Sequence, residues 1–503
     1  MRRGRSSARR RLVPELPFAM PSRAALAAGP PVLAVYWTFP LYWLSGSTMY
    51  ADNLSPTGNS SANIASGGRW RQRPYPFVDN TNLTDDIRIQ WMTLDIQNAW
   101  NIGIDGFRYG IINETVTMNW RWTEHASKMW AAAETFNATH KPGFHVCPDI
   151  DCTSVTSASG DPVVYADFIA PLLKSSAAYT WQNTGRPVVI FYTTTVSLLA
   201  SSWYDAFIAE LKAQGIANPA VILSYQGSNG TDLAQYSAHF TSGDFVAVHN
   251  WTTQNYTTAP SNIQTTIRNW CATNSPPVPF IGTVGPAWEN DRPANSPQPK
   301  QTEGYGLTTL MNEWQACILN NDPMMHIVSW NDDEESHNIR PSTGYQWVPY
   351  DVCAYYIAQY KTGTAPTIVR DAVYYCHRMH KGTTAYDTSK QTAGAYNVSF
   401  GPTPDVVIAH TFLKAAADVT ITTGGTAHTT TNVAAGVGTV TAAMVEGDTP
   451  TFKVTRGGVN VVPTFSSAFP TRSTITYQDL CYRMGSSTRA PISGVQSNLP
   501  QDR

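Results

Sequence analysis

Residues 332–335 are four consecutive acidic residues, Asp-Asp-Glu-Glu, which follow the apolar run 325–330 and precede His337. Neighbouring carboxylates repel one another, which raises the pKa of some of them and leaves others ionised. One protonated and one ionised carboxyl group are what acid–base catalysis near neutral pH requires. A solvated acidic turn is the alternative interpretation of such a run. We favour catalysis because the run comes directly after an apolar, strand-like segment.

Eight short apolar runs predict the scaffold that positions these carboxylates. Such runs are typical of buried parallel strands, and they cover residues 32–37, 106–112, 143–150, 187–192, 220–225, 245–251, 278–284 and 325–330. Segments of helical character lie between and after them, at residues 85–100, 119–136, 165–178, 198–214, 232–241, 261–273, 305–319 and 352–361. Eight strand–helix repeats predict a (β/α)8 TIM barrel. The competing doubly wound sheet carries a Gly-x-Gly-x-x-Gly fingerprint, which follows none of the runs.

The composition changes after residue 361. Residues 394–493 are rich in Thr, Val, Ala and Gly, and short alternating runs are separated there by glycine-containing turns. This pattern predicts a small C-terminal β-sandwich. We therefore expect a disordered basic tail at 1–31, a barrel at 32–361, a connector at 362–393, a sandwich at 394–493 and a tail at 494–503.

Charge, hydropathy and cysteine usage exclude several classes of function. The chain has 34 basic and 36 acidic residues, a balance that argues against broad nucleic-acid binding. No apolar run approaches the ~18 residues that a membrane span needs. The seven cysteines form no Cys-x-x-Cys motif, so a zinc ribbon is excluded; disulfide pairing stays open, with Cys147 and Cys152 as one candidate pair. His-Glu-x-x-His is also absent, and we expect neither a metal nor a cofactor.

The active site of a barrel enzyme lies at the carboxyl ends of its strands. Aromatic rings stack on sugar faces, and carboxylates and amides bind hydroxyl groups, so strand ends that combine the two suit a polyhydroxylated ligand. Alternation places Asp149 and Asp151 on one side of their strand, whereas Asp105 enters the second strand at the opposite end and fits a turn. The strand ends carry Tyr36 and Trp37, Arg108 and Tyr109, Asp149 and Asp151, Tyr192, Tyr225 and Gln226, His249, Asn250 and Trp251, Trp288 and Glu289, and Trp330, Asn331 and His337.

The segment W-N-D-x-x-E-S-H-x-I-x-P at residues 330–341 resembles the signature that ends the barrel of glycoside hydrolase family 71, the α-1,3-glucanases or mutanases. Residues 95–107, with D-I-x-x-A and G-I-D-G-F, resemble the second-strand motif of that family. The Y-Y-x-H-R at 374–378, followed by a β domain, resembles bacterial-type members. The resemblance covers nearly all of residues 32–490.

The resemblance implies endo-acting hydrolysis of α-1,3-glucosidic bonds with inversion. The two family carboxylates match Asp332 and Glu335, which we assign as general base and general acid by analogy with the related endo-mannosidases. Asp149 or Asp151 is then expected to hold sugar hydroxyls. The remaining substrate-binding residues are expected to be Tyr36, Trp37, His249, Trp251, Trp288, Trp330, Asn331 and His337.

Three positions depart from the family pattern. Asp333 and Glu334 stand where members usually have an aromatic residue and a glycine, and Tyr36 stands where they have histidine. Glu334 and Tyr36 motivate a second hypothesis, a hydrolase of another α-linked polysaccharide. A non-catalytic carbohydrate-binding protein is the third, which the intact Asp332 and Glu335 argue against.

The family resemblance also bears on partners and location. It implies a polysaccharide partner and an extracellular or cell-wall location, although the amino terminus shows no clear signal peptide. We expect a monomer. We expect the β domain to brace the barrel, because it lacks the tryptophans of many sugar-binding modules.

Overall fold

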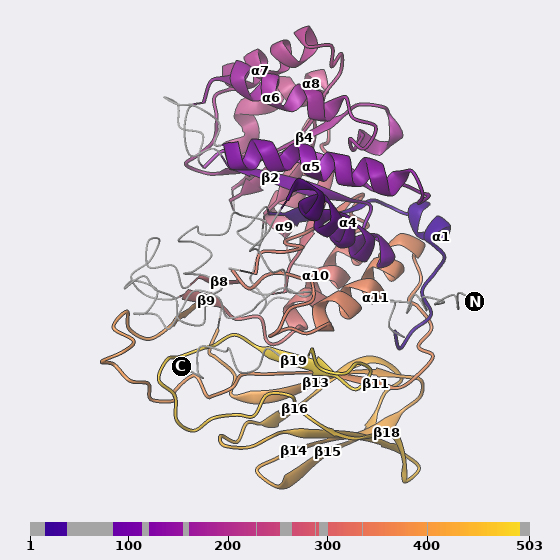
Figure 1. The fold of residues 1–503 in the computed structure, drawn as a ribbon, viewed down its shortest axis with the longest axis vertical. Helices are drawn as coiled ribbons and strands as arrows, with labels where there is room; N and C mark the ends of the chain where they lie inside the picture. The colour runs from indigo at the N-terminus through magenta and orange to yellow at the C-terminus, as the bar shows by residue number, and fades with distance from the viewer. Residues whose placement is uncertain are drawn as a thin grey trace, which may run out of the picture.

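The computed structural model describes residues 16–37, 84–112, 120–153, 160–227, 229–251, 264–286, 288–290, 300–333, 335–399 and 401–492. All eight predicted strands are present and close into one parallel barrel, which confirms the predicted fold class. Figure 1 shows the barrel with its helices above a separate β domain. The barrel strands are β1 (Val32–Tyr36), β2 (Gly106–Ile112), β3 (His145–Asp151), β4 (Val188–Thr194), β5 (Ala220–Gln226), β6 (Phe245–Asn250), β7 (Phe280–Val284) and β10 (Met325–Ile327).

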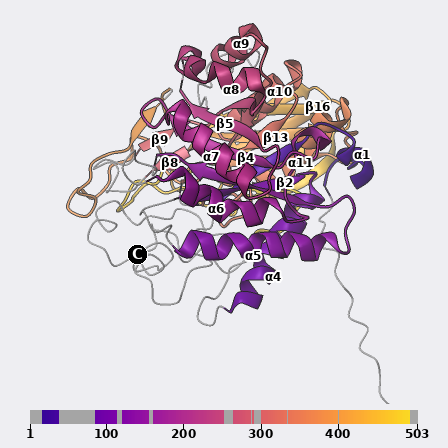
Figure 2. The same ribbon diagram turned by 90° about the horizontal axis from the view of Figure 1, so that it is seen from above.

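Helices alternate with these strands and surround the barrel, as the view from above shows (Figure 2). Side chains cap the starts of the helices Asp85–Asn101 and Pro162–Leu173: the Thr84 hydroxyl accepts from the amide of Ile87, and the Asp161 carboxylate accepts from that of Val163. The predicted helix at 232–241 is divided into a 3-10 turn, η3 (Gly230–Tyr236), and α8 (Ser237–Ser242). The other helices are α1 (Arg23–Ala27), α4 (Asp85–Asn101), α5 (Trp120–Asn137), α6 (Pro162–Leu173), α7 (Ser201–Ala213), α9 (Thr265–Thr273), α10 (Thr308–Leu319) and α11 (Val348–Thr362).

Alternation along each strand sorts side chains between the barrel interior and the layer under the helices. Leu33, Cys147 and Ile190 belong to a small apolar cluster inside the barrel, whereas Ala34 and Phe107 belong to the large core beneath the helices. All seven cysteines are buried and free, so the Cys147–Cys152 pair does not form a disulfide. Within the described ranges, no helix is long and apolar enough to cross a membrane.

Asp105 closes the amino-terminal end of the barrel, the end where the sequence places a turn. Its Oδ2 accepts from the backbone amide of Val32 at 2.9 Å and pairs with the ammonium group of Lys361, and its Oδ1 pairs with Arg23 at 3.0 Å. These contacts join the first strand, α1 and the end of α11 at one carboxylate.

The C-terminal domain is a sandwich of two four-stranded antiparallel sheets. Val373, Tyr375, Val419 and Phe452 belong to the apolar core between them. The sheets have the strand orders β16-β13-β11-β19 and β15-β14-β17-β18. Their strands are β11 (Ala372–His377), β13 (Val406–Leu413), β14 (Ala417–Thr423), β15 (Thr426–Val433), β16 (Gly436–Ala443), β17 (Thr451–Arg456), β18 (Val459–Ser466) and β19 (Arg483–Ser486). Because β11 lies between β13 and β19, the expected connector 362–393 in fact contributes an inner strand of the sandwich.

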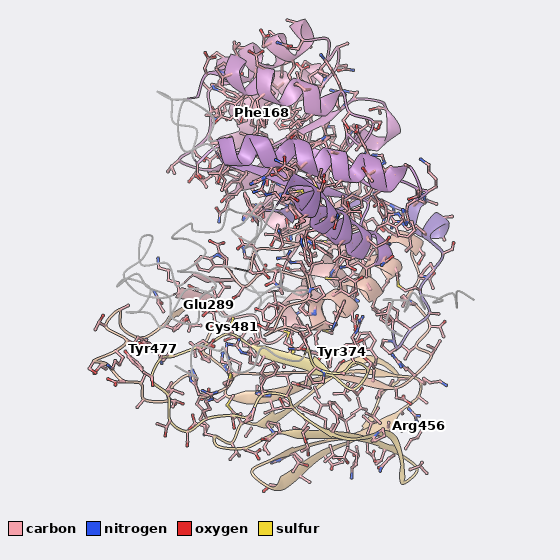
Figure 3. All side chains as sticks on the ribbon, viewed as in Figure 1. Phe168, Glu289, Tyr374, Arg456, Tyr477 and Cys481 are labelled. Carbon is pink, nitrogen blue, oxygen red and sulfur yellow. The ribbon has the colours of Figure 1, made fainter. Side chains whose placement is uncertain are left out.

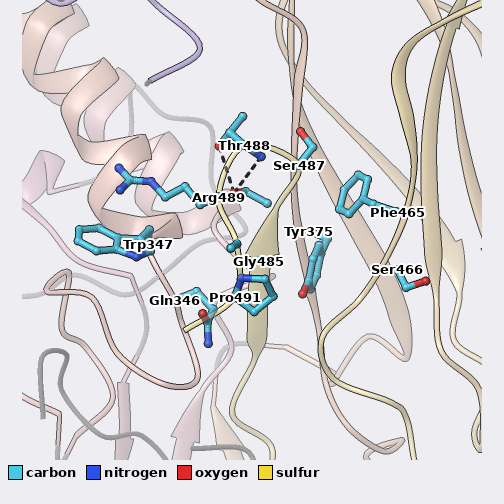
Figure 4. A pocket seen from close by; sticks show the side chains of 12 residues that line it. Gln346, Trp347, Tyr375, Phe465, Ser466, Gly485, Ser487, Thr488, Arg489 and Pro491 are labelled. Carbon is cyan, nitrogen blue, oxygen red and sulfur yellow. Dashed lines mark hydrogen bonds between the residues drawn. The ribbon is translucent and has the colours of Figure 1, made fainter. Parts of the chain in front are cut away.

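The two domains are joined by a shared sheet and by ion pairs. The β7–α10 segment forms β8 (Trp288–Asn290) and β9 (Lys300–Thr302), and β9 pairs in parallel with β12 (Asn397–Ser399). Arg489 forms an ion pair with Asp351 of α11 and stacks over Trp347 at 4.2 Å. A cavity of about 330 Å³ opens beside this contact, between Trp347 and the rings of Tyr375 and Phe465 (Figure 4).

The Asp105 contacts predict a large stability effect. The Lys361 side chain is 0% exposed, so an Asp105→Asn substitution leaves a buried ammonium group without its counter-charge. We expect the free energy of unfolding to fall by about 3–5 kcal/mol, measured by urea unfolding at pH 7. Asp205→Asn is the control, because that side chain is 71% exposed on α7. A loss no larger than that of the control would contradict this account.

Candidate active site

Asp332 and Glu335 share one imidazole at the carboxyl end of the barrel. The Nε2 atom of His337 lies 3.1 Å from Asp332 Oδ2 and 3.1 Å from Glu335 Oε2. The backbone amide of Glu335 donates to Asp332 Oδ1 at 3.0 Å. The Asp332 side chain is 5% exposed and that of Glu335 is 22% exposed, so Glu335 is the more accessible of the pair. The structure thus brings together the two predicted catalytic residues and the predicted site residue His337.

The loop after β10 is held in this shape by Ser329. Its Oγ accepts from the Asp332 amide at 2.7 Å, and its own amide donates to the His337 carbonyl at 2.8 Å. Ser336 has a φ of 54°, in the left-handed region, and this reverses the chain between Glu335 and His337. The reversal turns His337 back onto both carboxylates.

The electrostatics of the pair make His337 a cation. Burial by itself would lower the pKa of His337, but the charges and hydrogen bonds of Asp332 and Glu335 outweigh burial and raise it to about 10. The other ring nitrogen, Nδ1, has no hydrogen-bond partner among the described residues. The ring's charge therefore acts chiefly on the two carboxylates.

Trp288 and Glu289 of β8 form the wall beside Glu335. The indole Nε1 of Trp288 donates to Glu335 Oε2 at 2.9 Å, and the backbone amide of Glu289 donates to the Glu335 carbonyl at 2.9 Å. Trp288 is therefore part of the predicted site through its hydrogen bond to Glu335. The Glu289 side chain instead faces the β domain, where the Tyr396 hydroxyl donates to it.

Three aromatic residues form the floor next to the carboxylates. The rings of Trp37 and Trp251 meet edge to face with centroids 6.5 Å apart, and Tyr192 lies 4.6 Å from Trp251. Trp37 packs over Gly110, where a Cβ atom would come within 2.2 Å of the indole ring. Asp151 lies at the end of β3 and has its pKa raised to about 6, mainly by burial, with the charges of Asp149 and Glu335 adding to the effect.

A buried polar layer lies beneath this floor. Arg108 donates to Asp149 Oδ2 at 2.7 Å and to the Nδ1 atoms of His249 at 3.1 Å and His326 at 2.8 Å. Because a guanidinium group only donates, both Nδ1 atoms are acceptors and each ring carries its proton on Nε2. Burial and the neighbouring Arg108 lower the pKa of both histidines, so they are neutral. Asp149 and His249, predicted to contact sugar, are 1% and 0% exposed and lie one layer too deep to reach the mouth.

Tyr36 and Trp330 are corrections to the predicted site, because they face the helices rather than the barrel interior. Both are 0% exposed, and both pack against Phe107 in the outer core. The Tyr36 hydroxyl donates to Asp95 Oδ2 at 3.1 Å. Asn331 also differs from expectation, since its amide bonds to the backbone NH and CO of Trp37 at 2.8 and 2.6 Å. Asn331 thus positions Trp37 instead of facing the mouth.

Asp333 also points away from the mouth, so the acidic run does not act as one charged patch. Its Oδ2 pairs with Arg340 at 2.5 Å, and Arg340 also contacts Asp95 at 3.3 Å. Burial raises the pKa of Asp333 to about 7, against the effect of Arg340. Two departures from the family pattern, Asp333 and Tyr36, therefore meet in one buried network under the helices. Glu334, the third, lies outside the described residues.

Sequence reasoning selected neither Tyr192 nor Arg108 as a site residue. Tyr192 lies in the last part of β4, on the same side as Ile190, whose side chain faces the barrel interior. Arg108 is the charged residue within an otherwise uncharged strand segment, GFRYGII. Strand alternation and this buried charge were the signals that could have identified them.

Asp332, Glu335 and His337 each present a ligand atom within 4.8 Å of the others, a compact set that could hold a metal ion. A metal requires neutral imidazole, so it would have to displace the proton that the two carboxylates stabilise on His337. The protonated ring already supplies a positive charge at this position.

The raised pKa of His337 predicts a pH-dependent contribution to stability. Its folded-state pKa of about 10 lies above the ordinary value of 6.5, so the contribution is complete below pH 6.5 and is lost as pH rises through 10. We expect urea unfolding to show a difference between the wild type and His337→Gln that shrinks from pH 6.5 to pH 10. A difference that is constant over this range would contradict a charged His337.

Sequence comparisons identify relatives of this chain. The model of glycosyl hydrolase family 71 matches residues 81–488. A mutanase from Penicillium rubens is 31% identical over 166 residues, which span 30% of this chain and 36% of that protein. The chain therefore aligns with only about a third of the length of this relative.

Solved structures with a similar fold include the GH99 endo-α-mannosidase from Bacteroides thetaiotaomicron, with a TM-score of 0.45, 15% identity, and coverage of 66% of this chain and 97% of that chain. Another is a glycoside hydrolase-like protein with a TM-score of 0.47 and 13% identity, covering 68% of this chain and 96% of that one. The family match, which spans most of the barrel and the β domain, shows that this chain belongs to glycosyl hydrolase family 71.

Proposed function

We propose that this chain hydrolyses the α-1,3-glucosidic bonds of α-glucan, with Glu335 as general acid and Asp332 as general base and without a cofactor. The observation that carries the proposal is the shared His337, which fixes two carboxylates of unequal exposure at the barrel mouth. The P. rubens relative named a mutanase supports the substrate. Action on such a polymer fits an extracellular location.

The two carboxylates have different surroundings, and this difference supports their roles. Glu335 is the more exposed and receives hydrogen bonds from His337 and Trp288 at one oxygen, Oε2. In the proposed reaction, Glu335 takes a proton from His337 Nε2 and donates it to the glycosidic oxygen as the C–O bond breaks. Asp332 accepts a proton from the attacking water, which forms the new bond to the anomeric carbon. His337 Nε2 then takes up the proton that Asp332 accepted from water, and this restores the starting charges of all three groups.

The floor of the site supports a sugar substrate. Trp37 and Trp251 are 7% and 8% exposed and Tyr192 is half-buried, so in this proposal a glucosyl ring packs against the exposed edge of the cluster. Asp151, with its pKa raised to about 6, changes between hydrogen-bond donor and acceptor near neutral pH and binds sugar hydroxyls in either form.

The side chains of Tyr36 and Asp333 point toward the helices and away from the barrel mouth, and this bears on the choice of polymer. The grounds for a hydrolase of another linkage are Glu334, which lies outside the described residues, and Tyr36. Tyr36 and Asp333 lie in the buried network with Asp95 and Arg340. Since neither side chain faces the mouth, neither argues against the α-1,3 linkage.

Substitution of each carboxylate tests the acid–base pair. We expect release of sugars from α-1,3-glucan by the wild type, and a loss of about 10²-fold or more in both Asp332→Asn and Glu335→Gln. Dextran, starch and α-mannan complete the substrate panel, and Asp205→Asn is a surface control. Cleavage of another polymer alone would overturn the substrate, whereas full activity in both variants would overturn the assignment of the pair.

Inversion makes a separate prediction about the product. Inverting carboxyl groups usually stand ~6.5–9.5 Å apart, whereas the oxygens of Asp332 and Glu335 that face His337 lie within 4.8 Å. Inversion therefore requires the pair to separate when sugar and water enter. Proton NMR of fresh product is expected to show the β-anomer first, and initial formation of the α-anomer would establish retention.

A further inference from the structure

Trp288 and Glu289, which contact Glu335, are themselves held by the β domain. Tyr396 donates its hydroxyl to Glu289 Oε1 at 2.5 Å. Atoms of Glu289, Asp479 and Cys481 lie within 4.8 Å of one another, and Arg483 pairs with Asp479. We call these five residues the junction cluster. Figure 3 labels Glu289 and Cys481, which lie close together between the barrel and the sheets of the β domain.

The junction cluster also contacts the loop that carries the catalytic pair. The Cys481 thiol lies 3.2 Å from the hydroxyl of Ser336, the residue between Glu335 and His337. The carbonyl of Ser336 accepts from the Tyr345 hydroxyl at 2.8 Å. Of these contacts, the one through Cys481 comes from the β domain, whereas Tyr345 and the Glu289 amide, which donates to the Glu335 carbonyl, belong to the barrel part of the chain.

Because the junction cluster is buried, the loss of any of its polar contacts is costly. Glu289 is 3% exposed, Asp479 1% and Arg483 0%. Asp479 thus pairs with the Arg483 guanidinium group away from water, and the charge of Glu289 also acts on that group. An unmatched polar group is costly in such a place. Burial, followed by the charge of Glu289, raises the pKa of the Cys481 thiol far above its ordinary range, so the thiol stays protonated.

The cluster is anchored on the β-domain side as well. The backbone amide of Asp479 donates to His380 Nε2 at 2.8 Å, and Arg378 pairs with Glu303 at 2.6 Å close to β9. The position of the β8 hairpin is therefore set by the β domain, through side chains that the barrel does not supply.

We propose that the junction cluster is a positioning device for catalysis, in which Glu289 and Cys481 hold Trp288 and Glu335 in the geometry of proton transfer. Glu289 is a positioning residue, because it acts through Trp288 and the Glu335 backbone. The proposal rests on the proposed function of Glu335. It differs from simple bracing, which would lower stability without changing the chemical step.

Tyr396→Phe tests the cluster, with Tyr375→Phe as the matched control. Tyr375 lies in the core of the same domain, and its hydroxyl accepts from the Ala468 amide, away from the barrel loop. Small misplacements of catalytic groups cost up to about 10²-fold in rate, so we expect Tyr396→Phe to lower kcat about 10-fold with KM nearly unchanged. Tyr375→Phe is expected to keep the wild-type kcat. Equal kcat values in the two variants would overturn the proposal.

Conservative rescue provides a second test. Cys481→Ser keeps a donor opposite the Ser336 hydroxyl, whereas Cys481→Ala removes it. We expect the serine variant to retain most of the wild-type kcat and the alanine variant to lose kcat to a similar extent as Tyr396→Phe. Equal loss in both would show that the cluster acts only through packing, and so would contradict positioning.

Hydrogen exchange separates failure of this proposal from failure of the proposed function. Backbone amides of residues 329–340 are expected to exchange faster in Tyr396→Phe than in the wild type, and at the wild-type rate in Tyr375→Phe. This measurement needs no substrate. If the wild type cleaves no polymer but exchange changes as expected, the proposed function is wrong and the coupling between the junction cluster and residues 329–340 is supported. If exchange is unchanged in Tyr396→Phe, that coupling is contradicted.

Discussion

The charged hydrogen bonds of His337 to Asp332 and Glu335 are the interaction on which the candidate site depends. Two carboxylates with oxygens within 4.8 Å repel one another strongly in a partly buried site, and a cation between them removes that cost. The left-handed backbone at Ser336 and the hydrogen bonds of Ser329 maintain this arrangement, because they turn His337 back onto the two carboxylates. The same ring supplies a mobile proton beside Glu335. Charge balance and acid catalysis thus share one side chain.

The layer under the aromatic floor is also organised around a single cation. There one guanidinium group, that of Arg108, meets one carboxylate and two neutral imidazoles inside the barrel. Arg108 also lies 5.4 Å from the Trp251 ring centroid, so it supports the floor by a cation–π contact. Asp149 forms an ion pair with Arg108. Asp151, one layer higher at the end of β3, is therefore the carboxylate of this strand that lies closer to the mouth.

The barrel was predictable because strands buried on both sides leave continuous apolar runs in the sequence, and all eight runs became barrel strands. The positions of Trp37, Trp251, Asp332 and Glu335 at the carboxyl end of the barrel were predictable, because a strand end or the loop after it sets their direction. Tyr36 was misplaced because adjacent strand residues face opposite sides; with Trp37 inward, Tyr36 must face the helices. Sequence alone could not show that Arg340 draws Asp333 inward, or that Tyr396 reaches Glu289 from another domain, because both contacts depend on tertiary structure.

The charge state of His337 is the property that tests this account most directly. Nitrogen NMR of ¹⁵N-histidine-labelled protein, with His337 assigned by comparison with His337→Gln, reports whether each ring nitrogen carries a proton. The account predicts that both ring nitrogens of His337 remain protonated from neutral pH to pH 9, while the buried His249 and His326 stay neutral. A neutral His337 ring at pH 7 would contradict it, because the two carboxylates would then lack the cation that joins them.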